Sequence, residues 1–277
     1  MTINGRRTAM GQMVDAQVMT TSRRRWRGLI GGIALITVLM MATGCALFHD
    51  QEKEDKEQAE WHYEMATGYF ESEDTTHAIR ELSQALEYDP NHAEAHYLLG
   101  FIYMGRRDYH RAIQHFEETL RIDPDYHFAK NNLGTVYLDM GRWEEAAEVF
   151  DELLDQQLYT TPELAHNNLG WAYYNMGRHS EALEHLRMAV HLSPEMCLAD
   201  NNKGRVHEAM GNYSEARRHY RRAIEKCPQE YQEPHFYLGK LLQSEGDRNA
   251  AAHFERCIEI RAYNDLAERC RQYLQIR

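Results

Sequence analysis

Proline and basic residues are scarce in this sequence of 277 residues. Only six prolines occur, and because proline interrupts backbone hydrogen bonding, their scarcity favours long helices. Hydrophobic residues make up 43% of the chain, enough for a sizeable core and too many for a disordered protein. Residues 1–44 hold six of the 31 basic residues and one of the 43 acidic ones, so the rest carries a formal charge of about −17. A surface this acidic repels phosphate backbones, so we expect no nucleic-acid partner.

Signatures of catalysis are also missing. The chain has no P-loop, no dinucleotide-binding fingerprint, no G-x-S-x-G and no H-E-x-x-H motif. Acidic pairs such as Glu144-Glu145 are most simply solvated helix faces. We therefore expect no enzyme activity, no cofactor and no small-molecule substrate.

Long hydrophobic runs are absent except for one near the N-terminus. The thirteen residues from Leu29 to Met41 follow a basic segment and precede Ala42-Thr43-Gly44-Cys45. As a helix they rise only about 20 Å, less than the ~30 Å of a bilayer core, so residues 1–44 are expected to be a secretory signal. Met1, Met13 and Met19 are all possible starts.

Cys45 directly follows the small residues that end this segment. The arrangement resembles the lipobox of bacterial lipoproteins, which implies that the Cys45 thiol is lipidated; an ordinary signal peptide with a chance cysteine is the alternative. Because Ala46 replaces the aspartate that retains enteric lipoproteins in the inner membrane, we expect an outer-membrane anchor on the periplasmic face. Residues 45–58 would then be the lipidated cysteine and a charged, solvated tether.

Internal repeats organise the rest of the chain. Glycines recur at intervals of 34, 36, 34 and 35 residues, at Gly100, Gly134, Gly170, Gly204 and Gly239. An alanine follows about twelve residues after each of these glycines. The small residues let two helices approach closely, and prolines such as Pro90 and Pro124 end the second helix. This pattern resembles that of tetratricopeptide (TPR) repeats. It predicts an all-α TPR superhelix over residues 59–260, with six repeats at 59–92, 93–126, 127–162, 163–196, 197–231 and 232–260, and a capping helix within residues 261–277.

The first helices of TPR repeats line the concave face, and certain positions of each point into it. In repeats one to four these positions hold an apolar, aromatic and asparagine-containing set, whereas repeats five and six hold polar residues such as Arg205 and Lys240. Such a trough suits a peptide or protein partner, although some members could instead pack internally. The predicted groove residues are Tyr63, Phe70, Tyr97, Phe101, Met104, Phe128, Asn131, Leu138, Leu164, Asn167, Trp171 and Tyr174.

Histidine is abundant, with sixteen residues in the chain. His62, His96, His166 and His235 occupy the same position of their repeats, which the repeat geometry places about one helix pair apart. That distance is too long for a shared metal ion, so packing is the preferred interpretation and no metal site is expected.

Four cysteines remain after Cys45, an even number in a chain expected to enter an oxidising compartment. Cys197 begins the first helix of repeat five and Cys227 ends the second, so antiparallel packing brings them together. Cys257 and Cys270 lie on either side of the turn before the capping helix. We predict disulfides Cys197–Cys227 and Cys257–Cys270, with buried free thiols as the alternative.

An insertion after repeat three gives a more specific resemblance. Leu158-Tyr159-Thr160-Thr161-Pro162-Glu163, followed by Asn168-Leu169-Gly170, is similar to a segment of the PilF/PilW family of type IV pilus biogenesis lipoproteins. The resemblance covers residues 59–260 and implies a pilotin, which binds the outer-membrane secretin PilQ and promotes its localisation and multimeric assembly. The alternative is an NlpI-like periplasmic adaptor that docks cell-wall hydrolases or proteases. An enzyme is the third and least favoured class.

Overall fold

The computed structural model of the chain describes residues 51–156, 159–229 and 231–275, and this part contains helices and no strands. A first helix covers residues 51–71. The helices that follow are α2 (Thr75–Tyr88), α3 (Ala93–Gly105), α4 (Tyr109–Ile122), α5 (His127–Asp139), α6 (Trp143–Leu154), α7 (Pro162–Asn175), α8 (His179–Leu192), α9 (Cys197–Ala209), α10 (Tyr213–Lys226), α11 (Glu233–Ser244), α12 (Ala250–Ile260) and α13 (Asp265–Gln275).

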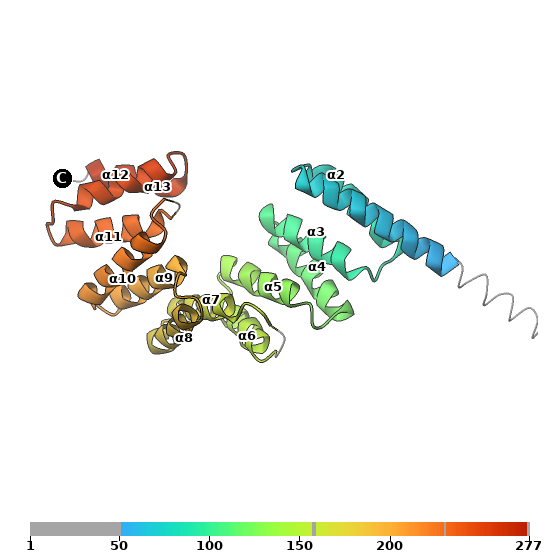
Figure 1. Cartoon of the computed structure of the whole chain (residues 1–277), viewed down its shortest axis with the longest axis horizontal. Coiled ribbons are helices and arrows are strands. Elements are labelled where there is room, and N and C mark those ends of the chain that lie inside the picture. The colour runs from blue at the N-terminus through green and yellow to red at the C-terminus, as the bar shows by residue number, and fades with distance from the viewer. Residues whose placement is uncertain (1–50, 157–158, 230, 276–277) are drawn as a thin grey trace, which may run out of the picture.

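Each repeat is a pair of antiparallel helices, and the pairs stack into an open arc. Figure 1 shows α5, α7 and α9 along the inner side of this arc and α6, α8 and α10 along its outer side. The fold is the predicted all-α TPR superhelix, and α13 is the predicted cap. None of the described helices is both long and apolar enough to cross a bilayer.

Glycine sets the close approach of the two helices in a repeat. A Cβ added to Gly204 would lie 2.5 Å from the Tyr220 ring, and one added to Gly134 would lie 2.7 Å from the Phe150 ring. Tyr220 and Phe150 are fully buried. The small residue of the first helix therefore makes room for the large residue of the second, as the spacing predicts.

The turns inside the repeats depend on left-handed backbone. Gly141, Gly177, Gly211 and Gly246 have φ between 72° and 75°, where glycine carries no Cβ penalty. The second helix of most repeats ends one or two residues before a proline, as α4 does with Asp123 as its cap before Pro124. The turn glycine thus precedes the second helix of a repeat, and the proline follows it.

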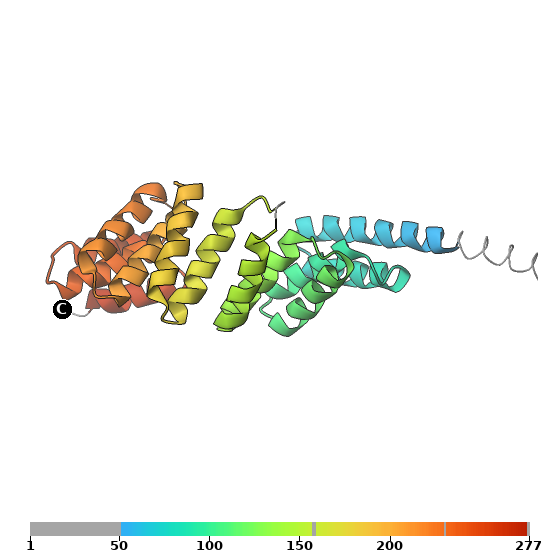
Figure 2. The same ribbon diagram turned by 90° about the horizontal axis from the view of Figure 1, so that it is seen from below.

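The first helix gives part of the predicted tether a regular structure. Of residues 45–58, those from 51 onward are described, and they are helical and continuous with the first repeat. Pairs four residues apart, Gln51–Asp55 and Lys56–Glu52, stabilise this helix locally. Figure 2 shows the helix extending away from the body of the arc. Its first turns are exposed to solvent and form a helical extension of the first repeat.

The apolar core is interrupted in repeat five. One cluster of buried hydrophobic residues runs from Ala66 to Val206, and a second runs from Ala216 to Cys270. Between them, buried polar residues occupy the facing sides of α9 and α10: Asp200 is 0% and His219 is 2% exposed. A buried carboxylate at this position of the stack needs hydrogen-bond partners of its own.

Candidate functional site

Most of the predicted groove residues are accessible to some degree. Phe101, Phe128 and Leu164 are exposed, Phe128 by 65%. The half-buried ones pack their inner side against the core, so they supply both stability and surface. The residues that pack in this way are Tyr63, Phe70, Tyr97, Met104, Trp171 and Tyr174. Asn131 is half-buried as well.

Two of the predicted groove residues are wrong as surface residues. Leu138 is only 8% exposed and belongs to the buried apolar cluster. Asn167 is only 2% exposed, and its Oδ1 accepts a hydrogen bond of 3.0 Å from Nδ2 of Asn202 on α9. The stacking of the next repeat covers Asn167, so it links repeats four and five and does not face a partner.

Four aromatic residues form the first part of the surface, here called the N-terminal aromatic cluster: Phe70, Tyr97, Phe101 and Tyr126. The Phe70 and Phe101 rings meet edge to face at 5.9 Å between centroids, and Tyr97 lies 5.0 Å from Tyr126. Nδ2 of Asn132 donates a hydrogen bond of 3.3 Å to the Tyr97 hydroxyl. The cluster joins the first helix, α3 and the start of α5 into one apolar surface with an edge of polar groups.

A second group surrounds an arginine and is here called the Arg205 cluster. The guanidinium carbon of Arg205 lies 4.1 Å from the centroid of Trp171, 5.2 Å from Tyr174 and 4.8 Å from Tyr237. Trp171 and Tyr174 stack at 5.0 Å. No described carboxylate lies within salt-bridge distance of Arg205. The rings hold the cation in place by cation–π attraction and leave guanidinium donors for other acceptors.

Tyr126, Tyr237 and the central role of Arg205 were not predicted from the sequence. Tyr237 aligns with Asn132, Asn168 and Asn202 of the earlier repeats. The signal was therefore an aromatic residue at a position that holds asparagine in the three repeats before it. Tyr126 precedes α5 as its cap residue, so it lies outside the helix positions considered.

A pocket of about 390 Å³ lies where the insertion after repeat three meets the start of α5. Two acidic residues, Asp123 and Asp125, share it with aromatic side chains, among them Phe128 and Tyr159. Burial raises the pKa of Tyr159, which therefore stays neutral. The insertion after repeat three thus lines a pocket on the protein surface.

The recurring histidines pack between the two helices of their own repeats, as predicted. Nδ1 atoms lie 3.1 Å apart in His96–His115, 3.0 Å in His166–His185 and 3.1 Å in His235–His253. Burial lowers the pKa of His115 and of His235 to about 4. Both are therefore neutral at neutral pH, and one ring can donate to the other.

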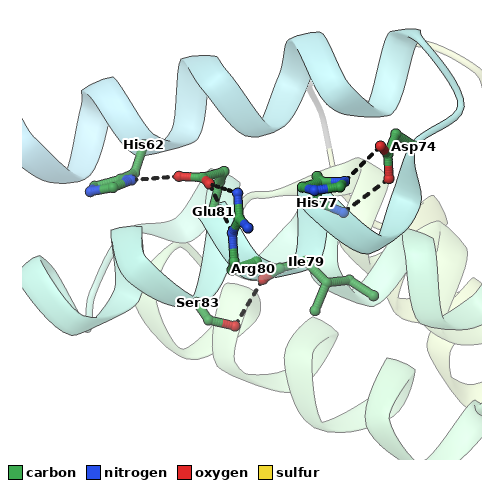
Figure 3. Close-up of polar contacts among 7 residues, drawn as sticks. All are labelled: His62, Asp74, His77, Ile79, Arg80, Glu81 and Ser83. Carbon is green, nitrogen blue, oxygen red and sulfur yellow. Dashed lines mark hydrogen bonds and ion pairs between the residues drawn. The ribbon is translucent and has the colours of Figure 1, made fainter.

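Repeats one and five replace one histidine of the pair with an acid. Figure 3 shows His62 pointing at Glu81, with 2.8 Å between His62 Nδ1 and Glu81 Oε2, while Arg80 binds the other carboxylate oxygen. These contacts, with His62 foremost, lower the pKa of Glu81. In repeat five, burial alone would raise the pKa of Asp200, but hydrogen bonds from His219 and Lys226 outweigh it and hold that pKa at about 2.

The four cysteines are joined as predicted. Cys197 is bonded to Cys227 with 6.0 Å between their Cα atoms, and Cys257 to Cys270 with 6.5 Å. Cys45 lies outside the described residues. Repeat five is therefore closed on itself by a covalent bond, and the second helix of repeat six is bonded to the cap, whereas the earlier described repeats are held by non-covalent contacts.

Models of a known protein family match the repeats of this chain. A family model described as tetratricopeptide repeat matches residues 63–127 and 131–196, and a second of the same description matches residues 201–230. No curated protein sequence is detectably similar to the chain.

Solved structures share the fold over most of the described chain. PilW, described as a widely conserved type IV pilus biogenesis factor, has a TM-score of 0.67 and 21% identity over 76% of this chain and 97% of its own. PilF of Pseudomonas aeruginosa has a TM-score of 0.63 and 20% identity over 79% and 99%. MamA of Desulfovibrio magneticus RS-1 has a TM-score of 0.57 and 21% identity over 61% and 94%. At these identities the likeness establishes a common fold.

Proposed function

Because this chain belongs to the tetratricopeptide-repeat family, we propose that it is a protein-binding scaffold that holds the secretin PilQ during type IV pilus biogenesis. In this proposal it acts as a pilotin, promoting the localisation and multimeric assembly of the secretin. The observation that carries the proposal is the fold shared with PilW and PilF, which extends over nearly their whole length. It agrees with the resemblance of the insertion segment to the same family.

The inner surface supports a protein partner rather than a small molecule. The N-terminal aromatic cluster offers exposed apolar area through Phe101, and Phe128, which shares a pocket with Tyr126, exposes a further ring. The Arg205 cluster adds a cation whose donors can bind carboxylates or backbone carbonyls of the partner. Aromatic residues and arginine are the residue types that most often dominate binding energy.

Secretin assembly in cells tests this proposal. In a strain that lacks the protein, the wild type should restore heat-resistant secretin multimers, and Phe101→Ala or Phe128→Ala should reduce them. We expect each variant to weaken binding by about 1–3 kcal/mol, the range for an aromatic anchor. Tyr213→Ala is the matched control, because Tyr213 is 53% exposed but begins α10 on the outer side. Normal assembly with both groove variants would exclude this surface as the binding site.

The membrane anchor is a second part of the proposal. We propose that the Cys45 thiol is acylated and that the lipid holds the protein on the periplasmic face of the outer membrane. Several acyl chains at about 0.8 kcal/mol per buried methylene make such an anchor stable. Cys45→Ala should abolish labelling by palmitate, and labelling that persisted would end the lipoprotein proposal.

The alternative, an NlpI-like adaptor, uses the same kind of surface and differs in its partner. Affinity capture from solubilised envelopes separates the two. Secretin subunits support the pilotin, whereas cell-wall hydrolases or proteases support the adaptor.

A further inference from the structure

Repeat five brings together three side chains that commonly bind transition metals. Glu215 and His219 lie one turn apart on α10, and His207 reaches them from α9. Each offers one ligand atom, and these atoms all lie within 4.8 Å of one another. Two imidazoles and one carboxylate form a common three-residue zinc set that leaves a fourth position open.

A buried carboxylate orients one of these ligands. Oδ1 of Asp200 lies 2.9 Å from Nδ1 of His219, and both side chains are almost fully buried. The carboxylate accepts the Nδ1–H, so the other nitrogen of His219, Nε2, is left unprotonated. Metal-binding histidines are typically held by a carboxylate in this way.

The other two side chains retain binding capacity. Nδ1 of His207 is buried and has no hydrogen-bond partner, which is costly for a polar atom unless something binds it. Arg218 binds one carboxylate oxygen of Glu215, namely Oε2. This contact leaves the second carboxylate oxygen for a further cation.

The preceding repeat has the same framework without the site. In repeat four, Tyr173 takes the place of His207, and Arg178 takes that of Asn212. The Arg178 guanidinium stacks over Tyr173 at 4.3 Å and binds Glu181, the equivalent of Glu215. Repeat three repeats this arrangement with Arg142 over Tyr137. In repeat five, a histidine ligand therefore replaces the tyrosine ring and Asn212 replaces the arginine that stacks on it, while Arg218 contacts one oxygen of Glu215.

We propose that His207, Glu215 and His219 bind a divalent transition-metal ion of the zinc type. Tetrahedral zinc with bonds of about 2.0–2.1 Å places its ligand atoms roughly 3.4 Å apart. Rotation of the three side chains brings their ligand atoms from within 4.8 Å of one another to this distance. The ion clamps α9 to α10 near their turn, whereas Cys197–Cys227 joins the opposite ends of the same helices. Repeat five, where the apolar core is interrupted, is then fastened at both ends.

The experiment is a titration of the purified full-length protein with Co²⁺ and then with Zn²⁺. We expect one equivalent of Co²⁺ with the visible absorption of a tetrahedral site, displaced by Zn²⁺. The variant His207→Tyr with Asn212→Arg gives repeat five the residues of repeat four, and so it should fold. Its affinity should fall by at least about 100-fold, since loss of an outer-shell partner alone costs 10–100-fold.

A matched control uses another histidine pair. His96→Lys with His115→Val gives repeat two the residues found at Lys130 and Val149 of repeat three. This variant should bind Co²⁺ as the wild type does. The proposal is overturned if the wild type takes up no Co²⁺, or if the repeat-two variant loses binding. It is also overturned if the repeat-five variant keeps its affinity for Co²⁺. An unchanged melting temperature in chelator shows that this variant is folded.

Discussion

At the scale of single residues, the fit between a small and a large side chain holds each helix pair together. The Tyr220 ring lies against Gly204, and its hydroxyl donates a hydrogen bond of 2.5 Å to Glu208. The ring is therefore fixed from both sides and cannot give way. Enlarging the small residue tests this fit directly.

Gly204→Ala should lower the free energy of unfolding. The added methyl meets two ring atoms of Tyr220 within 2.6 Å, and overpacking of this kind costs about 1–3 kcal/mol, whereas alanine gains at most about 1 kcal/mol of helix propensity. Gly68→Ala is the control, because a Cβ there meets nothing within 4 Å. Urea denaturation should show a loss for the first variant and a gain for the second. Equal shifts in both would contradict the close-approach argument.

Core and surface aromatic residues should respond oppositely to truncation. Phe150→Ala empties a fully buried site and should cost about 3–5 kcal/mol of stability. Phe128→Ala removes a ring that is 65% exposed and should change stability by less than about 0.5 kcal/mol. Thermal melts of the two variants check the assignment of each face. A large loss with Phe128→Ala would mean that the ring is part of the core.

Residue-level predictions from the sequence succeeded where the repeat itself decides the environment. Phe150 and Tyr220 occupy a repeated core position, and both are buried. Leu138 and Asn167 failed because their burial depends on how the next repeat stacks, which one repeat cannot reveal. The Arg205 cluster takes its two groups of rings and its cation from three different repeats, so no pattern within one repeat predicts it.

At the scale of helices, periodicity and turn residues predicted the array closely. The capping helix was expected within residues 261–277 and covers Asp265–Gln275. Residues 51–58 lack an apolar period, so periodicity did not predict that this part of the tether is helical. Their Glu, Lys and Gln residues favour helix, and the packed first repeat provides the nucleus from which that helix extends.

Both disulfides lie in the C-terminal part of the described chain, so only that part is stabilised by covalent cross-links. Removing Cys197–Cys227, which closes 30 residues, should cost about 3.6 kcal/mol on the chain-entropy model, and removing Cys257–Cys270, which closes 13, about 2.9 kcal/mol. Paired Cys→Ser variants measured by urea denaturation under non-reducing conditions give both values. Alkylation should detect no free thiol among these four cysteines before reduction. Unchanged stability in both variants would show that the bridges do not constrain the unfolded chain.

At the scale of the whole molecule, the buried histidine pairs make stability depend on pH. Burial lowers the pKa of His115 and His235 to about 4 and also lowers that of His166 and His185. In the unfolded chain these groups return to about 6.5. Between these values the unfolded state binds more protons, so stability falls as the pH falls from about 6.5 towards 4.

We expect about 1–2 kcal/mol of this loss from His115 alone between pH 7 and pH 5. His96→Lys with His115→Val removes the pair, so the variant should lose less stability than the wild type over the same interval. Melting curves at the two pH values provide the comparison. The same slope in both proteins would assign the acid sensitivity to other groups.

The placement of the disulfides also determines how the molecule would respond to a pulling force. Tension applied through the N-terminal helix meets no covalent cross-link before Cys197. The described chain from residue 51 to that point can extend to about 500 Å, repeat by repeat, because each repeat is held only by its neighbours. The next 30 residues stay shortened by roughly 100 Å until Cys197–Cys227 is reduced. The end that projects from the arc is thus the more extensible end, because residues 197–227 and 257–270 at the far end stay closed in covalent loops under load.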